Sequence, residues 1–297
     1  MRIFALSDIH IDFEENRAWI DTLFTKDYHR DALILAGDIC HDTILLKETL
    51  LQFKERFKYL FFVPGNHDLW IRDQRFPDSV RKFEDIKRFC QQQKIQIQPV
   101  LLGENTDPAP VWVVPLVSWY SLPEEGPDSL FLPKPGEDEN NRLWSDNYFI
   151  RWPQTKGLFH PAQFFLRLNK NEKPVLSEFP VITFSHFLPR KEMMFGESLK
   201  PDAEKIKKFD RNPRFNFSRV AGSSLIEEEI RRLGSVLHVY GHQHINRDRV
   251  LSGVRYVAHC LGYPHERSRG MPGKIDRELK WIWDTQSGMV GGTQFPG

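Results

Sequence analysis

The sequence has few cysteines and no pattern that would join them. Its 297 residues include three cysteines, Cys40, Cys90 and Cys260, and none stands in a C-x-x-C pair. An odd number at this spacing argues against a disulfide framework and against a cysteine-type zinc site, and it is typical of proteins in a reducing compartment. We therefore expect Cys40 and Cys260, which lie nearest the polar clusters described below, to be packing residues.

The sequence also has no long apolar run and almost no net charge. No segment reaches the ~18 apolar residues that a membrane-spanning helix needs, and Met1 and Arg2 lead directly into a strand-like run without a targeting signal. The 41 Lys and Arg residues nearly balance the 40 Asp and Glu residues. This balance gives no reason to expect a nucleic-acid or membrane surface. We expect a cytoplasmic protein without membrane contact.

Five short polar clusters recur along the chain, each beside an apolar run. They are Asp8-Ile9-His10, Gly37-Asp38, Gly65-Asn66-His67-Asp68, Ser185-His186 and Gly241-His242-Gln243-His244. A single Asp-x-His or Gly-Asp pair is usually a turn or a cap, and a single histidine is usually structural. The five together offer only Asp, Asn and His, the ligands that a pair of divalent ions prefers. The complete series therefore favours a metal site.

Apolar runs alternate with helical patterns in the first part of the chain. The pattern predicts strands at 3–6, 32–36 and 59–63, with helices at 14–24 and 43–57. Each strand ends at one of the polar clusters. In sheets of parallel strands the functional crevice lies beyond the carboxyl ends of the strands. We therefore expect the three loops that carry these clusters to meet.

The second part of the chain continues the pattern around one irregular segment. We expect a helix at 80–89, strands at 95–102, 111–117, 181–184 and 236–240, a helix at 225–233 capped by Ser223, a hairpin of 247–251 with 254–258, and a last strand at 279–283. The segment 119–180 is rich in proline and aromatic residues. Its aromatic content favours packing over disorder. We predict a single domain, 1–297, in which 119–180 is an insertion that forms a lid or rim beside the site.

The five clusters, in this order, resemble the motifs D-x-H, G-D, G-N-H-D/E, a lone His and G-H-x-H of the calcineurin-like metallophosphoesterase superfamily. The resemblance implies an α/β sandwich of two mixed β-sheets flanked by helices, with a metal site at the carboxyl ends of the strands. It also implies a ligand set in which Asp38 bridges two metals, with Asp8, His10 and His244 on one and Asn66, His186 and His242 on the other.

The chemistry expected of such a site is hydrolysis of a phosphate monoester or diester. Two divalent ions ~3.5–4 Å apart need a bridging anion, and a carboxylate with a hydroxide supplies it; the hydroxide then attacks phosphorus. The resemblance makes His67 the histidine that stabilises the phosphoryl oxygens or protonates the leaving alkoxide, with Asp68 as the residue that orients it. We expect manganese or iron, with zinc, nickel or cobalt as alternatives, and a small-molecule or nucleotide substrate.

One departure from the superfamily concerns the arginine that binds phosphate. Many of its phosphatases continue G-D-x-x-D-R-G, whereas here His41 and Asp42 stand at the last Asp and Arg positions. The departure argues against a protein Ser/Thr phosphatase, and the arginine must then come from elsewhere. Arginine forks bind phosphate in a bidentate manner. Arg190 is our preferred candidate, with Arg72 and Arg267 as alternatives.

Two other functions stay open. A nucleotide phosphodiesterase or nuclease is supported by the lysines and arginines between 191 and 219, although the net charge does not favour bulk nucleic acid as a partner. A non-catalytic scaffold that binds other proteins is the second alternative. Such scaffolds usually lack part of the ligand set, and in this chain every position is filled.

Overall fold

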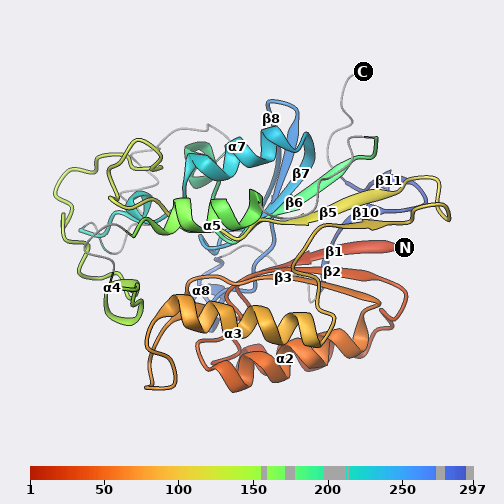
Figure 1. Ribbon diagram of the computed structural model, residues 1–297, viewed down its shortest axis with the longest axis horizontal. Coiled ribbons are helices and arrows are strands. Elements are labelled where there is room, and N and C mark those ends of the chain that lie inside the picture. Colours follow the sequence, from red (N-terminus) through yellow and green to blue (C-terminus); the bar gives the residue numbers. More distant parts are fainter. Residues whose placement is uncertain (155–158, 171–177, 197–211, 213, 272–277, 292–297) are drawn as a thin grey trace.

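The fold is an α/β sandwich of two mixed β-sheets (Figure 1). It is seen in a computed structural model that describes residues 1–154, 159–170, 178–196, 212, 214–271 and 278–291. The first sheet has the order β11-β10-β1-β2-β3 and the second β4-β5-β6-β7-β9-β8. The predicted fold class is therefore confirmed.

The first sheet is parallel at its centre and antiparallel at one edge. Its strands are β1 (Arg2–Leu6), β2 (Ala32–Ala36), β3 (Tyr59–Val63), β10 (Lys280–Asp284) and β11 (Gly288–Met289). β1, β2 and β3 run parallel, and β10 pairs with β1 in the opposite direction. The loops that leave β1, β2 and β3 therefore emerge at the same edge of the sheet.

The second sheet has four parallel strands at its centre. Its strands are β4 (Val100–Leu102), β5 (Val111–Pro115), β6 (Val181–Phe184), β7 (Ser235–Tyr240), β8 (Arg247–Leu251) and β9 (Val254–Ala258). β5, β6, β7 and β9 run parallel, while β4 and β8 are antiparallel edge strands. The predicted strand at 95–102 is shorter than expected, because Gln96 hydrogen-bonds to Leu60 and Phe62 of the first sheet before the chain crosses to the second.

Helices cover the outer faces of both sheets. The long helices are α1 (Glu14–Leu23), α2 (Thr43–Arg56), α3 (Ser79–Gln92), α5 (Pro161–Lys170) and α7 (Ser224–Arg232). The described residues also form the short helices α4 (Asp146–Phe149) and α8 (Pro264–Arg267) and the 3₁₀ turns η1 (His67–Leu69), η2 (Lys191–Met194) and η3 (Phe217–Arg219). Asp42 caps α2 by accepting the N–H groups of Ile44 and Leu45. Within the described residues, no helix is both long and apolar enough to cross a membrane.

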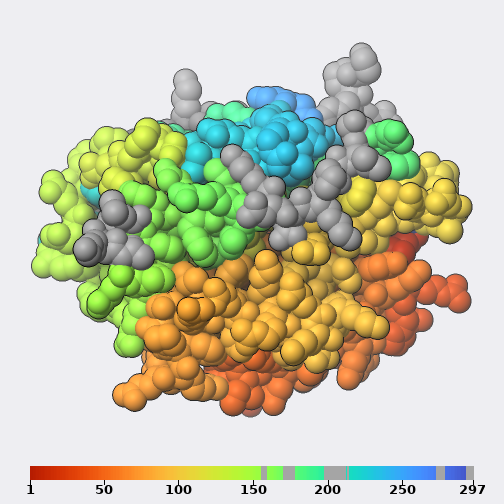
Figure 2. All heavy atoms as spheres, in the orientation of Figure 1, coloured from red at the N-terminus to blue at the C-terminus, as the bar shows by residue number. Residues whose placement is uncertain are grey.

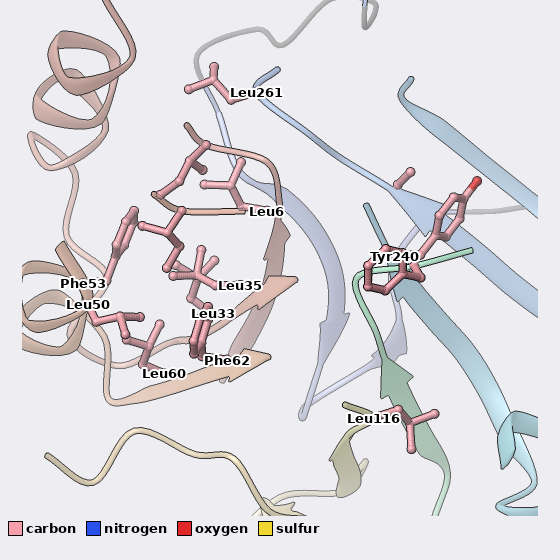
Figure 3. Packing of buried hydrophobic residues seen from close by; sticks show 14 of the residues in the cluster. Leu6, Leu33, Leu35, Leu50, Phe53, Leu60, Phe62, Leu116, Tyr240 and Leu261 are labelled. Carbon is pink, nitrogen blue, oxygen red and sulfur yellow. The ribbon is translucent and has the colours of Figure 1, made fainter. Parts of the chain in front are cut away.

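The core has two layers. Between the sheets, Ile3 and Ile34 of the first sheet pack with Ile182 and Val239 of the second. Outside the first sheet, Leu33, Leu35, Leu60 and Phe62 turn towards Leu50 and Phe53 of α2 (Figure 3). Strands buried on both faces need apolar residues at nearly every position, which explains why β1, β2 and β3 read as continuous apolar runs.

Candidate metal centre

Backbone hydrogen bonds join the loops after β1 and β2, and the loop after β3 joins them where the N–H of His67 donates to Asp38 Oδ1 at 2.9 Å. The N–H of Asp8 donates to Gly37 O at 2.9 Å, and the N–H of His10 donates to Asp38 O at 3.1 Å. Asp8, His10 and Asp38 all have positive φ, as do His242 and His244 of the loop after β7. Such left-handed backbone at non-glycine residues is costly and clusters at functional sites. The expectation that the three loops meet is confirmed.

The carboxylate of Asp68 holds two of these loops together. It accepts the N–H groups of Asp38, Ile39 and Cys40 at 2.9–3.0 Å and that of Gly65 at 2.8 Å. These bonds use both of its oxygens, and none of its hydrogen bonds in the described structure reaches His67. The prediction that Asp68 orients His67 is therefore corrected: Asp68 fixes the backbone from which Asp38 projects.

Four side chains form the first group of potential metal ligands. Asp8, His10, Asp38 and His244 are buried, and one potential ligand atom from each lies within 4.8 Å of the others. The Nε2 atoms of His10 and His244 are 2.9 Å apart, and Asp8 Oδ1 lies 3.4 Å from His244 Nε2. This is the set that the sequence predicted for one metal.

A second group shares Asp38 with the first. Asp38, His186 and His242 again place ligand atoms within 4.8 Å of one another. His186 Nε2 lies 3.4 Å from Asp38 Oδ2, 3.2 Å from Asn66 Oδ1 and 3.2 Å from His242 Nδ1. The predicted ligands of the second metal thus lie together around His186 Nε2, and both groups approach Oδ2 of Asp38.

The outer nitrogens of three histidines determine what their inner nitrogens can do. His186 Nδ1 lies 2.9 Å from Ala36 O, and His242 Nε2 lies 3.0 Å from Val220 O. A carbonyl oxygen only accepts, so these outer nitrogens carry the proton and the inner ones keep a lone pair. In the same way His244 Nδ1 donates to Glu266 Oε2 at 2.7 Å.

The inner nitrogens and the carboxylate oxygens therefore converge, and any protons between them can be replaced by a metal ion. A divalent cation satisfies such a set, and an outer acceptor on each histidine is the usual support of a metal ligand. The residues present fit two metal ions.

The charges in the cluster favour the same interpretation. Burial works to raise the pKa of Asp38, but His186 and His67 hold it well below its usual range. Burial also lowers the pKa of His186 and His244, yet the nearby carboxylates raise these values to about 9 and about 10. Without metal, protons on these two histidines compensate the buried anions. Metal binding would displace those protons.

His67 borders both groups without belonging to either. Its Nε2 lies 4.0 Å from Asp38 Oδ2 and 3.2 Å from the Tyr263 hydroxyl. Its ring stacks on Trp70 with the centroids 3.6 Å apart. Burial lowers the pKa of His67 to about 4. The side chain therefore faces the centre from one side, at the place expected of a group that contacts substrate.

The arginines lie differently from our expectation. Arg190, the preferred candidate, is held by Glu192 at 2.8 Å and Glu227 at 3.4 Å, neither of which belongs to the two ligand groups. Arg267 donates to the carbonyls of Leu261 and Gly262 and to Asn16. These partners leave neither guanidinium free for phosphate, so the preference for Arg190 is corrected.

Arg72 has no carboxylate partner within the described part of the chain. It contacts His41 Nε2 at 3.4 Å and the ring of Phe149 at 4.8 Å. Together with His41 and Trp70 it lines a cavity of about 190 Å³. Trp70, which also stacks on His67, is the lining residue that this cavity shares with the surroundings of the metal centre, and none of the lining residues is a proposed metal ligand. His41 in turn is paired with Asp12 at 2.6 Å.

Four residues around the centre were missed from the sequence. They are Trp70, Asp146, Tyr263 and Glu266, which contact the predicted site residues Asn66, His67 and His244. None stands in one of the five clusters, and Asp146 and Glu266 come from short helices that the apolar pattern does not indicate. Periodicity could not find them because their roles depend on particular contacts with residues far apart in the sequence.

The fold and this site define a class of protein. An α/β sandwich whose loops gather two groups of buried Asp, Asn and His side chains around one shared aspartate is the architecture of a metal-dependent hydrolase. The chain belongs to the calcineurin-like phosphoesterase family, whose model matches residues 1–246. It is therefore a metal-dependent phosphoesterase.

One relative, matched both by sequence and by its crystal structure, gives the comparison detail. The chain is 25% identical over 285 residues to the [acyl-carrier-protein] phosphodiesterase PptH of Mycobacterium tuberculosis (strain ATCC 25618 / H37Rv), a match that covers 91% of this chain and 80% of that protein. The crystal structure of phosphopantetheinyl hydrolase (PptH) from Mycobacterium tuberculosis has a TM-score of 0.68 at 20% identity and covers 95% of both chains. This likeness shows the common fold.

Proposed function

We propose that the protein is a dinuclear-metal phosphodiesterase that hydrolyses the ester between a phosphopantetheinyl group and an acyl carrier protein. The observation that carries the hydrolase is the pair of buried donor groups that share Asp38. The substrate is supported by the likeness to the carrier-protein phosphodiesterase over 91% of this chain. In the reaction, water adds to phosphorus, the bond to the carrier-protein oxygen breaks, and that oxygen leaves as an alcohol.

Each ligand position has a proposed role. Asp8, His10 and His244 would hold one ion, Asn66, His186 and His242 the other, and Asp38 both. Two ions held there would supply an activated water and neutralise charge on the phosphoryl oxygens. Manganese or iron is our preferred pair, since the donors are hard or borderline in character.

His67 is the proposed catalytic residue outside the ligand set. Its Nε2 atom, between Asp38 and the Tyr263 hydroxyl, can hydrogen-bond to a phosphoryl oxygen or deliver a proton to the leaving alcohol. Arg72 is the proposed substrate-binding residue, because its guanidinium borders the cavity next to Trp70 and is not held by a carboxylate.

The nuclease alternative rests on basic residues between 191 and 219, of which the structure describes only some. Residues 197–211 lie outside the described part of the chain. Arg219, which is described and buried, is held by Glu125 and Glu137, each at 2.6 Å. The charge of Arg219 is therefore paired with carboxylates of the protein and is not available to a nucleic-acid backbone.

The test is hydrolysis of a holo-acyl carrier protein by the metal-loaded enzyme. Protein stripped with chelator is reloaded with Mn(II), Fe(II), Ni(II) or Zn(II), and intact mass follows conversion of the holo carrier to its apo form. Asp38→Asn serves as the blank, and p-nitrophenyl phosphate and bis-p-nitrophenyl phosphate test monoester and diester cleavage. We expect metal-dependent loss of the phosphopantetheinyl group. Cleavage of the diester probe without any action on the carrier would retain the phosphodiesterase and reject this substrate.

A further inference from the structure

A buried carboxylate from the insertion reaches the metal centre. Asp146 begins α4, within the segment 119–180, and is 2% exposed. Its Oδ1 accepts from Asn66 Nδ2 at 2.9 Å and from Trp70 Nε1 at 2.6 Å, while Oδ2 lies 3.3 Å from the Tyr120 hydroxyl. One carboxylate therefore contacts both the amide of a proposed metal ligand and the indole that supports His67.

These contacts decide which way the amide of Asn66 points. An indole N–H can only donate, so Oδ1 of Asp146 accepts from Trp70, and it also accepts from Asn66 when the carboxyl group is ionised or carries its proton on Oδ2. The part of Asn66 that faces this oxygen must then be its NH₂ group. The amide oxygen is directed to the opposite side, where it lies 3.2 Å from His186 Nε2. An amide turned the other way would present its NH₂ group, a donor that cannot bind a metal ion.

The same oxygen also fixes the ring that stacks on His67. The Trp70 indole is held at its Nε1 by Asp146, and one of its faces lies against the imidazole of His67 with centroids 3.6 Å apart. Phe149 is the last residue of the same four-residue helix α4, and its ring packs beside that of Trp70 with the centroids 5.0 Å apart. The insertion thus supports the second ligand group and His67 through a single short helix.

We propose that Asp146 is a positioning residue that orients Asn66 for the second metal and Trp70 for His67, so that the insertion completes the metal centre. The proposal rests on the proposed metal role of Asn66. It gives the insertion a function distinct from that of a closing lid, because the contact is made by buried groups within the described structure.

The experiment measures metal affinity at each site, with Asp146→Leu as the disruptive variant and Tyr120→Phe as its matched control. The leucine leaves the donors of Asn66 and Trp70 without this acceptor, whereas the phenylalanine removes the contacts of the Tyr120 hydroxyl with Oδ2 and with the Trp144 indole N–H. Apo-protein is titrated with Mn(II) by calorimetry, and bound metal per chain is counted after dialysis. We expect Asp146→Leu to weaken the second metal by about 10–100-fold, the usual effect of losing an outer partner of a ligand. Tyr120→Phe should bind both metals as the wild type does.

Two further variants separate positioning from general damage. Asp146→Asn retains an oxygen that can accept both bonds, so it should restore most of the metal affinity. On an Asn66→Ala background, Asp146→Leu should weaken the second metal no further, because residues that act through one another are not additive. If Asp146→Leu does not fold, Asp146→Ser makes the same test with room for a water.

The results that overturn the proposal are distinct from those that overturn the proposed function. Wild-type affinity for both metals in a folded Asp146→Leu or Asp146→Ser variant removes the positioning role. An equal further loss on the Asn66→Ala background also removes it, since the effect would then not pass through Asn66. Failure of the wild-type protein to bind two metals, or activity of Asp38→Asn, instead rejects the metal centre itself.

Discussion

We propose that some side chains of this centre hold metal and that others contact substrate. His67 is the clearest case of the second kind, because it faces Asp38 at 4.0 Å but lies in neither ligand group. Its contacts are the Trp70 ring and the Tyr263 hydroxyl. Removing its imidazole should therefore change the reaction without changing the metal site.

The variant His67→Asn should bind two metals and lose very roughly a hundredfold or more in kcat. That is the usual scale for one acid–base or electrostatic group. Steady-state kinetics on the diester probe, with metal content measured on the same samples, checks this. The exposed His29 offers a control, and His29→Asn should match the wild type. A metal-loaded His67→Asn enzyme with full activity would remove His67 from the mechanism.

Replacement of Arg72 should change the kinetics, whereas replacement of Arg190 should change the stability of the fold. Arg72→Ala should raise KM with both metals retained, since it removes a cation at the cavity beside Trp70. Arg190→Ala should leave the kinetics near those of the wild type but lower the free energy of unfolding by about 1 kcal/mol, because it breaks its ion pairs with Glu192 and Glu227. Kinetics and urea unfolding of both variants measure the contrast. A raised KM in Arg190→Ala alone would reverse the assignment.

At the scale of secondary-structure elements, each ligand group has a carboxylate from a short helix beside one of its members. Glu266 of α8 contacts His244 of the first group, and Asp146 of α4 contacts Asn66 of the second. Glu266 of α8 accepts from His244 Nδ1 at 2.7 Å and from its own helix cap, the N–H of Tyr263, at 2.8 Å. The carboxylate of Glu266 therefore caps α8 and holds the ring of His244 at the same time. α8 lies beyond residue 246, where the match to the family model ends.

Loss of this carboxylate should weaken the first metal selectively. Glu266→Ala should lower its affinity by about 10–100-fold, as expected for an outer partner of a histidine ligand, and leave the second metal unchanged. Mn(II) titration of apo-protein resolves the two sites, and Glu228→Ala, on the exposed face of α7, is the control. Equal weakening of both metals would mean that Glu266 supports the fold of the whole centre and not His244 in particular.

The sequence predicts the long elements and the ligands but not the short helices that support them. β2, β3 and β6 coincide with the predicted strands, because apolar runs that end in polar clusters reflect burial on both faces. The candidate ligands, which the structure brings together, could be chosen from the sequence because their types and order match a known series of motifs. Partners such as Ala36 O and Val220 O cannot be read from side-chain patterns, and the role of Asp68 depends on backbone N–H groups of a distant loop.

At the scale of the whole molecule, the centre lies where the two sheets meet. Asp8, Asp38 and Asn66 follow strands of the first sheet, while His186 and His242 follow strands of the second. Figure 2 shows the N-terminal part of the chain, in red to yellow, and the rest, in green to blue, in contact along one face of the molecule. We propose that the chain is one domain, because residues from both sheets share the inner core and the same ligand groups.

Metal bound at this junction should therefore stabilise the entire fold. A ligand at a hundred times its dissociation constant adds about 2.7 kcal/mol per site, which corresponds to a rise in Tm of roughly 5 °C or more for a chain of this size. Thermal unfolding followed by circular dichroism, with chelator and then with Mn(II), measures the shift. Asp38→Asn should lose most of it, since both ligand groups contain that carboxylate. An undiminished Tm shift in Asp38→Asn would mean that the stabilising ion binds elsewhere, and metal binding would then not depend on the junction of the two sheets. The first residues to replace would be the nearby group of Asp12, Cys40 and His41.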